Sequence, residues 1–194
     1  MPGSILGERV VRKEDPKFLT SGGKYLDDLN DLPELEGAAF VAYARSTVAH
    51  GTITSIDTGE AAGMPGVLGV YTAEDLGLEP TPSPFNPAVA RTMLASGKVR
   101  YVGEPVVAVV AETREQAADA TEVVFIDYDV LEAVIDPEAA LTSDVHLYEA
   151  AGGNAVFDST ALGMPDMTGD EFFAGCDVTV TGRFVNQRRR SDPA

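Results

Sequence analysis

The side chains that could perform chemistry are few in this chain and lie far apart. His50 and His146 are its two histidines, and each falls at a strand end or in a loop. Histidine can act as an acid, a base or a metal ligand, but two isolated histidines are more often structural or exposed to solvent. Cys176 is the single cysteine, so this chain alone can form neither an internal disulfide nor a cysteine-based zinc or iron–sulfur site.

Two short segments have the composition of known ligand-binding loops without their spacing. Gly22-Gly23-Lys24 lacks the longer glycine spacing of a phosphate-binding loop, and Tyr25 stands where that loop needs Ser or Thr. A polar run that precedes Pro33 lacks the later Glu and the flanking helices of a calcium-binding loop; it comprises Asp27, Asp28, Asn30 and Asp31. Both segments are therefore interpreted as backbone turns.

Four carboxylates form an acidic edge at Asp127, Asp129, Glu132 and Asp136. Paired carboxylates catalyse proton transfer when their surroundings separate their pKa values. Alternation along a strand more simply places Asp127 and Asp129 together on one solvated face, and this interpretation is favoured. No H-E-x-x-H, C-x-x-C or G-x-S-x-G motif is present. The sequence therefore predicts no catalytic, cofactor-binding or metal-binding residue in this chain.

Composition limits the classes of partner. The 194 residues suit one domain of ordinary size, and 44% hydrophobic with 23% charged residues is a typical globular balance. The formal net charge of -17 disfavours nucleic acid and anionic lipid surfaces as partners. The first ten residues include Glu8 and Arg9 and resemble neither a signal peptide nor a membrane helix. The cytoplasm is the expected location.

The elements that must position any site are short. Residue types and alternation predict strands over 37–46, 50–57, 67–71, 98–102, 104–111, 122–129, 131–135 and 177–186. The first two are expected to form a hairpin through 47–49. The run 104–111, EPVVAVVA, is apolar on both faces and is predicted to be a central, covered strand. Short helices are expected over 58–64, from Thr72, over 113–124 and from Asp136, where Pro137 suits the first helical position.

This order indicates an α+β domain with one main mixed sheet, a strand–helix–strand unit near 104–129 and flanking short helices. Residues 1–36 are polar and rich in turns, and they are predicted to form an extended N-terminal arm. The domain proper is expected over 37–187, with a frayed tail over 188–194. Four prolines within 77–97 predict an exposed irregular loop, which is either a contact segment or a solvated insertion.

Six stretches together resemble one family, in that family's order. Three of them are VRKEDPKFLTSGGKYLDD at 11–28, MPGVLGVYTAED at 64–75 and KVRYVGEPVVAVVA at 98–111. The others are 44–50 with 53 and 56–57, then 116–120 leading into 124–136, and 180–188. The chain resembles the a/b hammerhead domain of the xanthine dehydrogenase and aldehyde oxidase family over roughly residues 7–188. Its opening arm is most similar to the large subunit of aerobic carbon monoxide dehydrogenases.

The resemblance implies a role within a larger enzyme. Family members hydroxylate a carbon centre or oxidise carbon monoxide at a molybdenum held by molybdopterin cytosine dinucleotide, and pass electrons through [2Fe–2S] clusters to FAD. The molybdenum-contacting residues of the family lie beyond the hammerhead domain, so none carries over to a position here. The implied function is a scaffold and subunit-contact domain that is not catalytic alone. Its implied partners are the molybdenum-binding domains and the iron–sulfur and FAD subunits.

Two other functions stay open at this point. A free-standing adaptor or binding protein could reuse the fold, because a fold does not fix a function. A small cofactor-independent enzyme could use the carboxylates near 127–136, which would require a pocket around Asp127 or Asp129 and a raised carboxyl pKa. The sequence does not identify the substrate of the parent enzyme.

Overall fold

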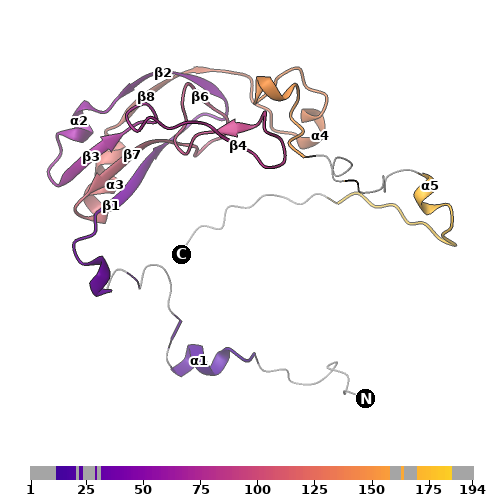
Figure 1. Cartoon of the computed structure of the whole chain (residues 1–194), viewed down its shortest axis with the longest axis horizontal. Coiled ribbons are helices and arrows are strands. Elements are labelled where there is room, and N and C mark those ends of the chain that lie inside the picture. The colour runs from indigo at the N-terminus through magenta and orange to yellow at the C-terminus, as the bar shows by residue number, and fades with distance from the viewer. Residues whose placement is uncertain are drawn as a thin grey trace.

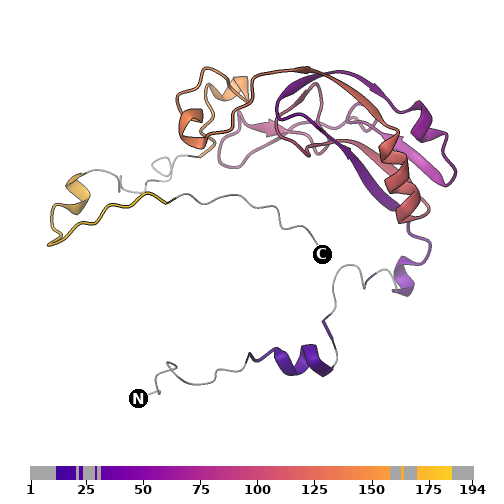
Figure 2. The same cartoon turned by 180° about the vertical axis from the view of Figure 1, so that it is seen from behind.

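The folded part of the molecule consists of two three-stranded antiparallel sheets with short helices at their edges (Figures 1 and 2). The computed structural model describes residues 12–20, 22–23, 29, 32–157, 163 and 170–184. The mixture of helices and small sheets confirms the predicted α+β class. The prediction of a single main mixed sheet is wrong, because the two described three-stranded sheets are separate and all of their strand pairs are antiparallel.

The first sheet has the strand order β1 (Phe40–Arg45), β7 (Pro105–Ala111), β3 (Val67–Tyr71). β7 lies in the centre and pairs with a strand on both edges. Val106, Val107 and Val109 in β7 are fully buried. The prediction of a central, covered strand over 104–111 is thus confirmed, since an apolar strand is stable where both of its faces and both of its edges are occupied.

The second sheet has the order β6 (Lys98–Val99), β2 (Gly51–Asp57), β8 (Phe125–Val130). Its pairing ends where the Leu131 N–H donates to His50 O at 2.9 Å. Because β2 begins at Gly51, directly after His50, the residues that follow Leu131 have no partner in this ladder. The strand predicted over 131–135 is accordingly not formed.

The predicted hairpin through 47–49 is wrong, because β1 and β2 belong to different sheets. Hydrogen bonds at Ser46 explain the separation. The Ser46 N–H donates to Glu104 O at 2.8 Å, and the Gly103 N–H donates to Ser46 O at 2.7 Å. The Val48 N–H then donates to Ser46 Oγ at 3.2 Å. These bonds fix the end of β1 against the start of β7 and turn the chain toward the second sheet.

Helix α3 (Arg114–Glu122) connects β7 to β8 and covers one face of the first sheet. Thr113 and Gln116 form a capping box, in which each side chain accepts from the other residue's backbone N–H. Ala117 and Ala120 are buried, and Ala120 packs with Val109. The predicted strand–helix–strand order is confirmed, but α3 crosses from one sheet to the other.

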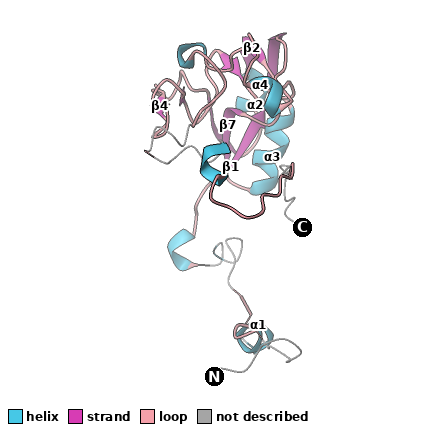
Figure 3. Cartoon of the chain, turned by 90° about the vertical axis from the view of Figure 1, so that its right-hand side faces the viewer, coloured by secondary structure: helices cyan, strands magenta, loops and turns pink. Residues whose placement is uncertain are grey.

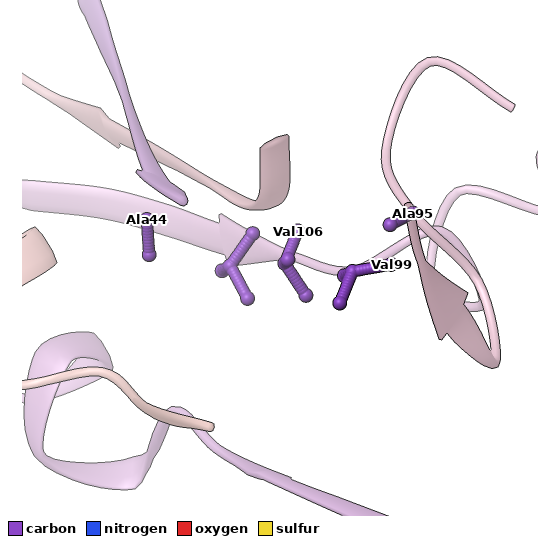
Figure 4. Packing of buried hydrophobic residues seen from close by; sticks show 5 residues of the cluster. Ala44, Ala95, Val99 and Val106 are labelled. Atoms are coloured by element: carbon purple, nitrogen blue, oxygen red, sulfur yellow. The ribbon is translucent and has the colours of Figure 1, made fainter. Parts of the chain in front are cut away.

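The main core cluster lies between the two sheets. Figure 4 shows its buried members and labels Ala44, Ala95, Val99 and Val106, which come from both sheets and the loop before β6. Ile53, Ile56, Ile126 and Tyr128 of the second sheet pack against it while partly buried. Burial of this apolar surface is what holds the two sheets together.

The remaining short helices follow the predicted boundaries with two exceptions. α2 (Gly59–Ala62) and α4 (Pro137–Ala140) form, and Asp136 caps α4 by accepting from Glu138 N and Ala139 N. Thr58 precedes α2 without making a side-chain cap bond. The helix predicted from Thr72 is wrong: the chain makes a turn there, because Gly77 adopts a φ of 57° and ends the helical geometry.

The 77–97 loop is largely irregular, as predicted, and contains the short hairpin β4 (Thr81–Pro82) and β5 (Ala90–Arg91). The prediction that the whole loop is exposed is wrong, because Leu94 and Ala95 are buried. Leu94 packs with Ala73 and with Ala108 of β7. The end of this loop is therefore part of the folded core.

Both ends of the described chain differ from the predictions. The arm contains α1 (Asp15–Thr20) and the 3-10 helix η2 (Pro33–Leu35), and α1 lies apart from the sheets (Figures 1 and 3). The strand predicted over 177–186 is wrong for its described part, 177–184, which follows α5 (Asp170–Phe173) without strand pairing. Alternating residues do not form a strand without a partner edge. The tail 188–194 lies outside the described residues.

Candidate functional site

His50 is a structural residue at the start of β2. Its side chain is 3% exposed, and Nδ1 lies 2.7 Å from Glu132 O. Because a carbonyl only accepts, Nδ1 carries the proton and donates this bond. The bond joins the start of β2 to the segment after β8, which agrees with the structural interpretation of this histidine.

Two buried polar atoms, the second ring nitrogen of the same histidine (His50 Nε2) and Tyr128 Oη, have no hydrogen-bond partner among the described residues. Burial raises the pKa of Tyr128. The negative charge of Glu104 raises this pKa further. The Ser46 side chain lies near the hydroxyl and lowers the pKa, although the two groups do not form a well-aligned hydrogen bond. The phenol therefore stays protonated and neutral inside the fold at neutral pH.

The other residues singled out from the sequence do not come together. His146 is half-buried in the segment before the 3-10 helix η3 (Glu149–Ala151), and Cys176 is exposed after α5. Gly22 has a φ of 69°, as a turn glycine does. Lys24, Asp27, Asp28, Asn30 and Asp31 lie outside the described residues.

The acidic edge is solvated, as the alternation along β8 predicts. Asp127 and Asp129 are both exposed, with the half-buried Tyr128 between them. Asp127 Oδ2 accepts a hydrogen bond from Ser55 Oγ at 2.9 Å, while Asp136 is the cap of α4. These carboxylates thus lie on a solvated face or cap a helix. Neither aspartate of β8 is buried as acid–base catalysis would need.

The part of the chain that the structure describes contains no set of side chains arranged to bind a metal ion. No group of three or more His, Cys, Asp or Glu side chains is placed there to hold an ion. The described residues therefore supply no side-chain donor set for a directly coordinated metal ion or an iron–sulfur cluster, and no step through such a centre is assigned to them. Likewise, no described helix has the length and apolar character to cross a membrane.

A polar hollow of about 430 Å³ lies between β2 and the turn after β3. Thr72 and Asp75 line it and hold each other, since Asp75 Oδ2 accepts from the Thr72 N–H at 2.8 Å and from Thr72 Oγ1 at 2.7 Å. These bonds lower the pKa of Asp75. The Asp75 carboxylate therefore has its hydrogen-bond partners within the turn, and the hollow is interpreted as the surface of a capped turn.

The clearest candidate for a functional surface is the face of the first sheet opposite α3, called the outer face below. In the strand register, Tyr43 and Tyr71 flank Ala108, and Val41 lies beside Val110. Val41, Tyr43 and Tyr71 remain 51%, 41% and 37% exposed. Arg45 extends the row, with its guanidinium 5.4 Å from the centre of the Tyr43 ring. Ala108 between the two tyrosines is covered by Ala73 and Leu94, so the exposed apolar surface lies on the edge strands β1 and β3. Exposed apolar surface of this kind is typical of a protein contact surface.

Sequence reasoning missed the outer face although a signal was present. Val41 and Tyr43 alternate with Ala42 and Ala44, which places large residues on one face and small ones under α3. The alternation could not show which face the helix covers, because the alanines are the buried side. That assignment needs the packing of α3 on the sheet.

The architecture defines an α+β domain built from two small antiparallel sheets and an apolar contact face. The family model for the "Aldehyde oxidase and xanthine dehydrogenase, a/b hammerhead domain" matches residues 20–132. The chain therefore belongs to this family, and the resemblance drawn from the six sequence stretches is confirmed.

Among curated proteins, the chain is 42% identical over 144 residues to the nicotine 6-hydroxylase large subunit of Paenarthrobacter nicotinovorans, covering 71% of this chain and 17% of that protein. It is 39% identical over 145 residues to the carbon monoxide dehydrogenase large chain of Afipia carboxidovorans, covering 73% and 17%. The predicted likeness to the carbon monoxide dehydrogenase large subunit is thereby supported. The chain spans about a sixth of the length of these relatives.

Solved structures give the same answer. Quinoline 2-oxidoreductase from Pseudomonas putida 86 aligns with a TM-score of 0.60 at 36% identity, covering 76% of this chain and 19% of that chain. CO dehydrogenase from Oligotropha carboxidovorans aligns with a TM-score of 0.57 at 38% identity, covering 71% and 17%. The hammerhead fold is therefore shown by sequence and by structure.

Proposed function

We propose that this chain is the scaffold and subunit-contact domain of a molybdenum-dependent hydroxylase or carbon monoxide dehydrogenase-type oxidoreductase, and that it is not catalytic alone. The observation that carries the proposal is the apolar outer face of the β1–β7–β3 sheet. One face of this sheet packs against α3. The other is covered at its centre by Ala73 and Leu94 and presents Val41, Tyr43 and Tyr71 of its edge strands to solvent. Family membership supplies the context in which such a face has a partner.

The proposed partners are the molybdenum-binding domains and the iron–sulfur and FAD subunits of the same enzyme. In this proposal those parts carry the molybdopterin cytosine dinucleotide, the [2Fe–2S] clusters and the FAD, and supply the redox chemistry. No residue of this chain is assigned to the cofactors. The acidic balance of the chain favours basic patches on the partner surfaces. The expected location of the assembly is the cytoplasm.

The proposed division of labour within the chain follows its packing. Residues 37–187 form the hammerhead domain, with 1–36 as an arm and 188–194 as a tail. The arm helix α1 buries none of its residues, and the 77–97 loop exposes Phe85 and Met93 while its end packs on β7. We assign partner contacts to the 11–28 arm, to the 77–97 loop and to the outer face.

Hydrogen exchange tests this proposal directly. The chain is mixed with the molybdenum-binding, iron–sulfur and FAD subunits, and amide exchange is compared with that of the chain alone. Slower exchange is expected in the 11–28 arm, in β1 and in the exposed part of the 77–97 loop, because contact excludes water from these segments. Unchanged exchange in all three would overturn the proposal and favour a free-standing adaptor.

A matched pair of variants separates contact from folding. Tyr43→Lys places a charge on the outer face, and Phe125→Lys places the same charge on an exposed apolar position of the second sheet. Tyr43→Lys is expected to weaken subunit binding by about 10-fold or more, as the loss of an aromatic contact at an interface commonly does. Phe125→Lys should bind like the unmodified chain. Equal binding by both variants would contradict the role of the outer face.

A further inference from the structure

A second and larger hollow lies along the 77–97 loop up to its buried end, and apolar and aromatic residues with one buried carboxylate line it. Its volume is about 910 Å³, within the range of small-molecule pockets. Residues of the β4–β5 hairpin, the turn before β7 and the segment around η3 line it; among them are Pro82, Phe85, Tyr101, Tyr148 and Val156. Figure 1 shows β4 beside the orange segment that contains η3.

Aromatic contacts fix the walls of this hollow. Phe85 from the loop packs edge-on against Phe157, with 5.3 Å between the ring centres. Tyr148 lies under the Arg100 guanidinium, 4.5 Å from the ring centre. The loop and the segment after α4 are therefore joined across the hollow, so that its aromatic lining is held in place.

Glu104 is the buried charged group of this hollow. The residue is 6% exposed and lines the cavity. Its Oε2 accepts from the Arg100 N–H at 2.6 Å, and its backbone is held by the bonds at Ser46 described above. The carboxylate makes no ion pair with the described residues, and its second oxygen accepts no hydrogen bond from them. A buried carboxylate without a counter-charge is costly, and a bound cation removes that cost.

The basic side chains near this hollow do not supply the missing charge. The Arg45 guanidinium donates to Gly103 O at 3.0 Å and makes no ion pair with Glu104 among the described contacts. The Arg100 guanidinium donates to Leu147 O at 2.7 Å and to Lys98 O at 3.3 Å, so it faces carbonyl groups and the Tyr148 ring. Arg91 lines the same hollow but is exposed, where solvent and salt screen its charge. The interior of the hollow thus combines one unpaired carboxylate with aromatic and apolar walls.

We propose that this hollow binds an organic cation, an ammonium group carried on an apolar or aromatic body. The ammonium donates to the free oxygen of Glu104 and lies near the ring of Tyr101, which attracts a cation through its face. The Tyr148 ring already faces the Arg100 guanidinium and serves as a wall. The apolar body occupies the space between the Pro82 side and Val156. The site is lined in part by the 77–97 loop, to which partner contacts are assigned above. It is tested on the chain without partners, so that the two proposals are judged separately.

Binding is tested on the full chain with three probes of similar shape: phenethylammonium, 2-phenylethanol and phenylacetate. Amide chemical shifts are followed by NMR during titration at fixed ionic strength. Phenethylammonium is expected to shift the amides of Tyr101, Glu104 and Met93 in a saturable way, and to bind about 10-fold or more tightly than the alcohol, because a hydrogen bond to a buried charge is worth that factor. Phenylacetate should not bind there.

Two matched variants make the test specific. Glu104→Gln keeps an acceptor for the Arg100 N–H, so the turn should fold, and it should abolish the preference for the amine over the alcohol. Glu74→Gln removes the same charge from an exposed position on the other hollow and should leave binding unchanged. Tyr101→Leu keeps an apolar wall and should weaken the amine more than the alcohol.

Three results would overturn the proposal: equal binding of the amine and the alcohol, an undiminished preference for the amine in a folded Glu104→Gln variant, or equal losses in the Glu104 and Glu74 variants. The last result would mean that the cation responds only to the overall negative charge of the chain. Melting temperatures of the variants establish folding in each case. None of these outcomes depends on partner subunits, so the result is separable from the scaffold proposal.

Discussion

β7 forms the strand that its sequence predicts, whereas the segment 177–184 does not. The segment DVTVTGRF alternates as an ideal half-buried strand does, yet it forms no strand, and Val180 is 88% exposed. β7, PVVAVVA, has no alternation and is the central strand of the first sheet, paired on both edges and buried on both faces. Available partners, more than residue period, determine which segment becomes a strand.

Core truncation gives the largest expected difference between these two regions. Val109→Ala removes two methyl groups that pack with Ala61 and Ala120. It should lower the free energy of unfolding by about 2–3 kcal/mol in urea denaturation. Val180→Ala, the matched change in the unpaired segment, should alter it by less than about 0.5 kcal/mol. A comparable loss in both variants would mean that 177–184 is packed in solution.

Two glycines sharpen the comparison between packed and open positions. Gly66 and Gly77 both have positive φ, 79° and 57°. A Cβ on Gly66 would lie 2.2 Å from the Gln116 side chain, whereas one on Gly77 would meet nothing within 4 Å. Gly77→Ala should cost about 1 kcal/mol of stability from backbone strain alone. Gly66→Ala should cost about 2 kcal/mol, because it also displaces Gln116 from the capping box.

If thermal or urea unfolding gave the same loss for both glycine variants, the contact between Gly66 and the cap of α3 would be unimportant. Gly66→Ala combined with Gln116→Ala distinguishes the two contributions. The double variant should lose less than the sum of the single variants, since both act on the same cap.

Two threonines at helix starts provide a smaller contrast. The Thr113 side chain accepts from Gln116 N, while Thr58 precedes α2 without a side-chain cap bond. Thr113→Ala should therefore destabilise the chain by about 1 kcal/mol. Thr58→Ala should have an effect of a few tenths of a kcal/mol at most. A larger effect at Thr58 than at Thr113, measured by urea denaturation, would refute this assignment of the caps.

The smallest expected effect concerns pH. The hydrogen bond from Lys98 holds the pKa of Glu149 below its ordinary value of 4.5. The folded chain thus keeps this carboxylate charged where the unfolded chain protonates it, so its contribution is present above pH 4.5 and is lost as the pH falls through the folded pKa. Glu149→Gln should flatten the acid limb of stability against pH slightly, because the Glu149 side chain is exposed to solvent.

Lys98→Met provides the control for that measurement. It removes the other partner of the pair and should flatten the acid limb to a similar degree. A steeper dependence of melting temperature on pH between about 3 and 5 in either variant would contradict the assignment, since each removes a source of proton linkage.

The sequence predicted the local elements better than their arrangement. The apolar run of β7, the cap at Thr113 and the cap at Asp136 depend on neighbouring residues, and all three were found where local chemistry placed them. The division into two sheets depends on hydrogen bonds between Ser46 and residues 103–104, which are far away in the sequence. No local pattern encodes such a contact.

The candidate surfaces show the same limit. The outer face could be read as an alternating strand, but its exposure depends on where α3 packs. Glu104 stands at the start of the predicted strand 104–111, and its buried place beside residues near 82–93 and near 148–156 depends on segments far away in the sequence. The solvated character of Asp127 and Asp129 was predictable, since it needs only the two-residue period of β8.

The central claim is that this chain acts by contact and leaves the metal chemistry to its partners. Its most direct test measures molybdenum by mass spectrometry in the purified chain and in the complex that the tagged chain retains when produced with its partner subunits. The account predicts no stoichiometric molybdenum in the chain alone, stoichiometric molybdenum in the retained complex, and loss of that metal when Val41 and Tyr43 are both changed to Lys. Stoichiometric molybdenum in the chain alone, or full retention by the folded double variant, would contradict it.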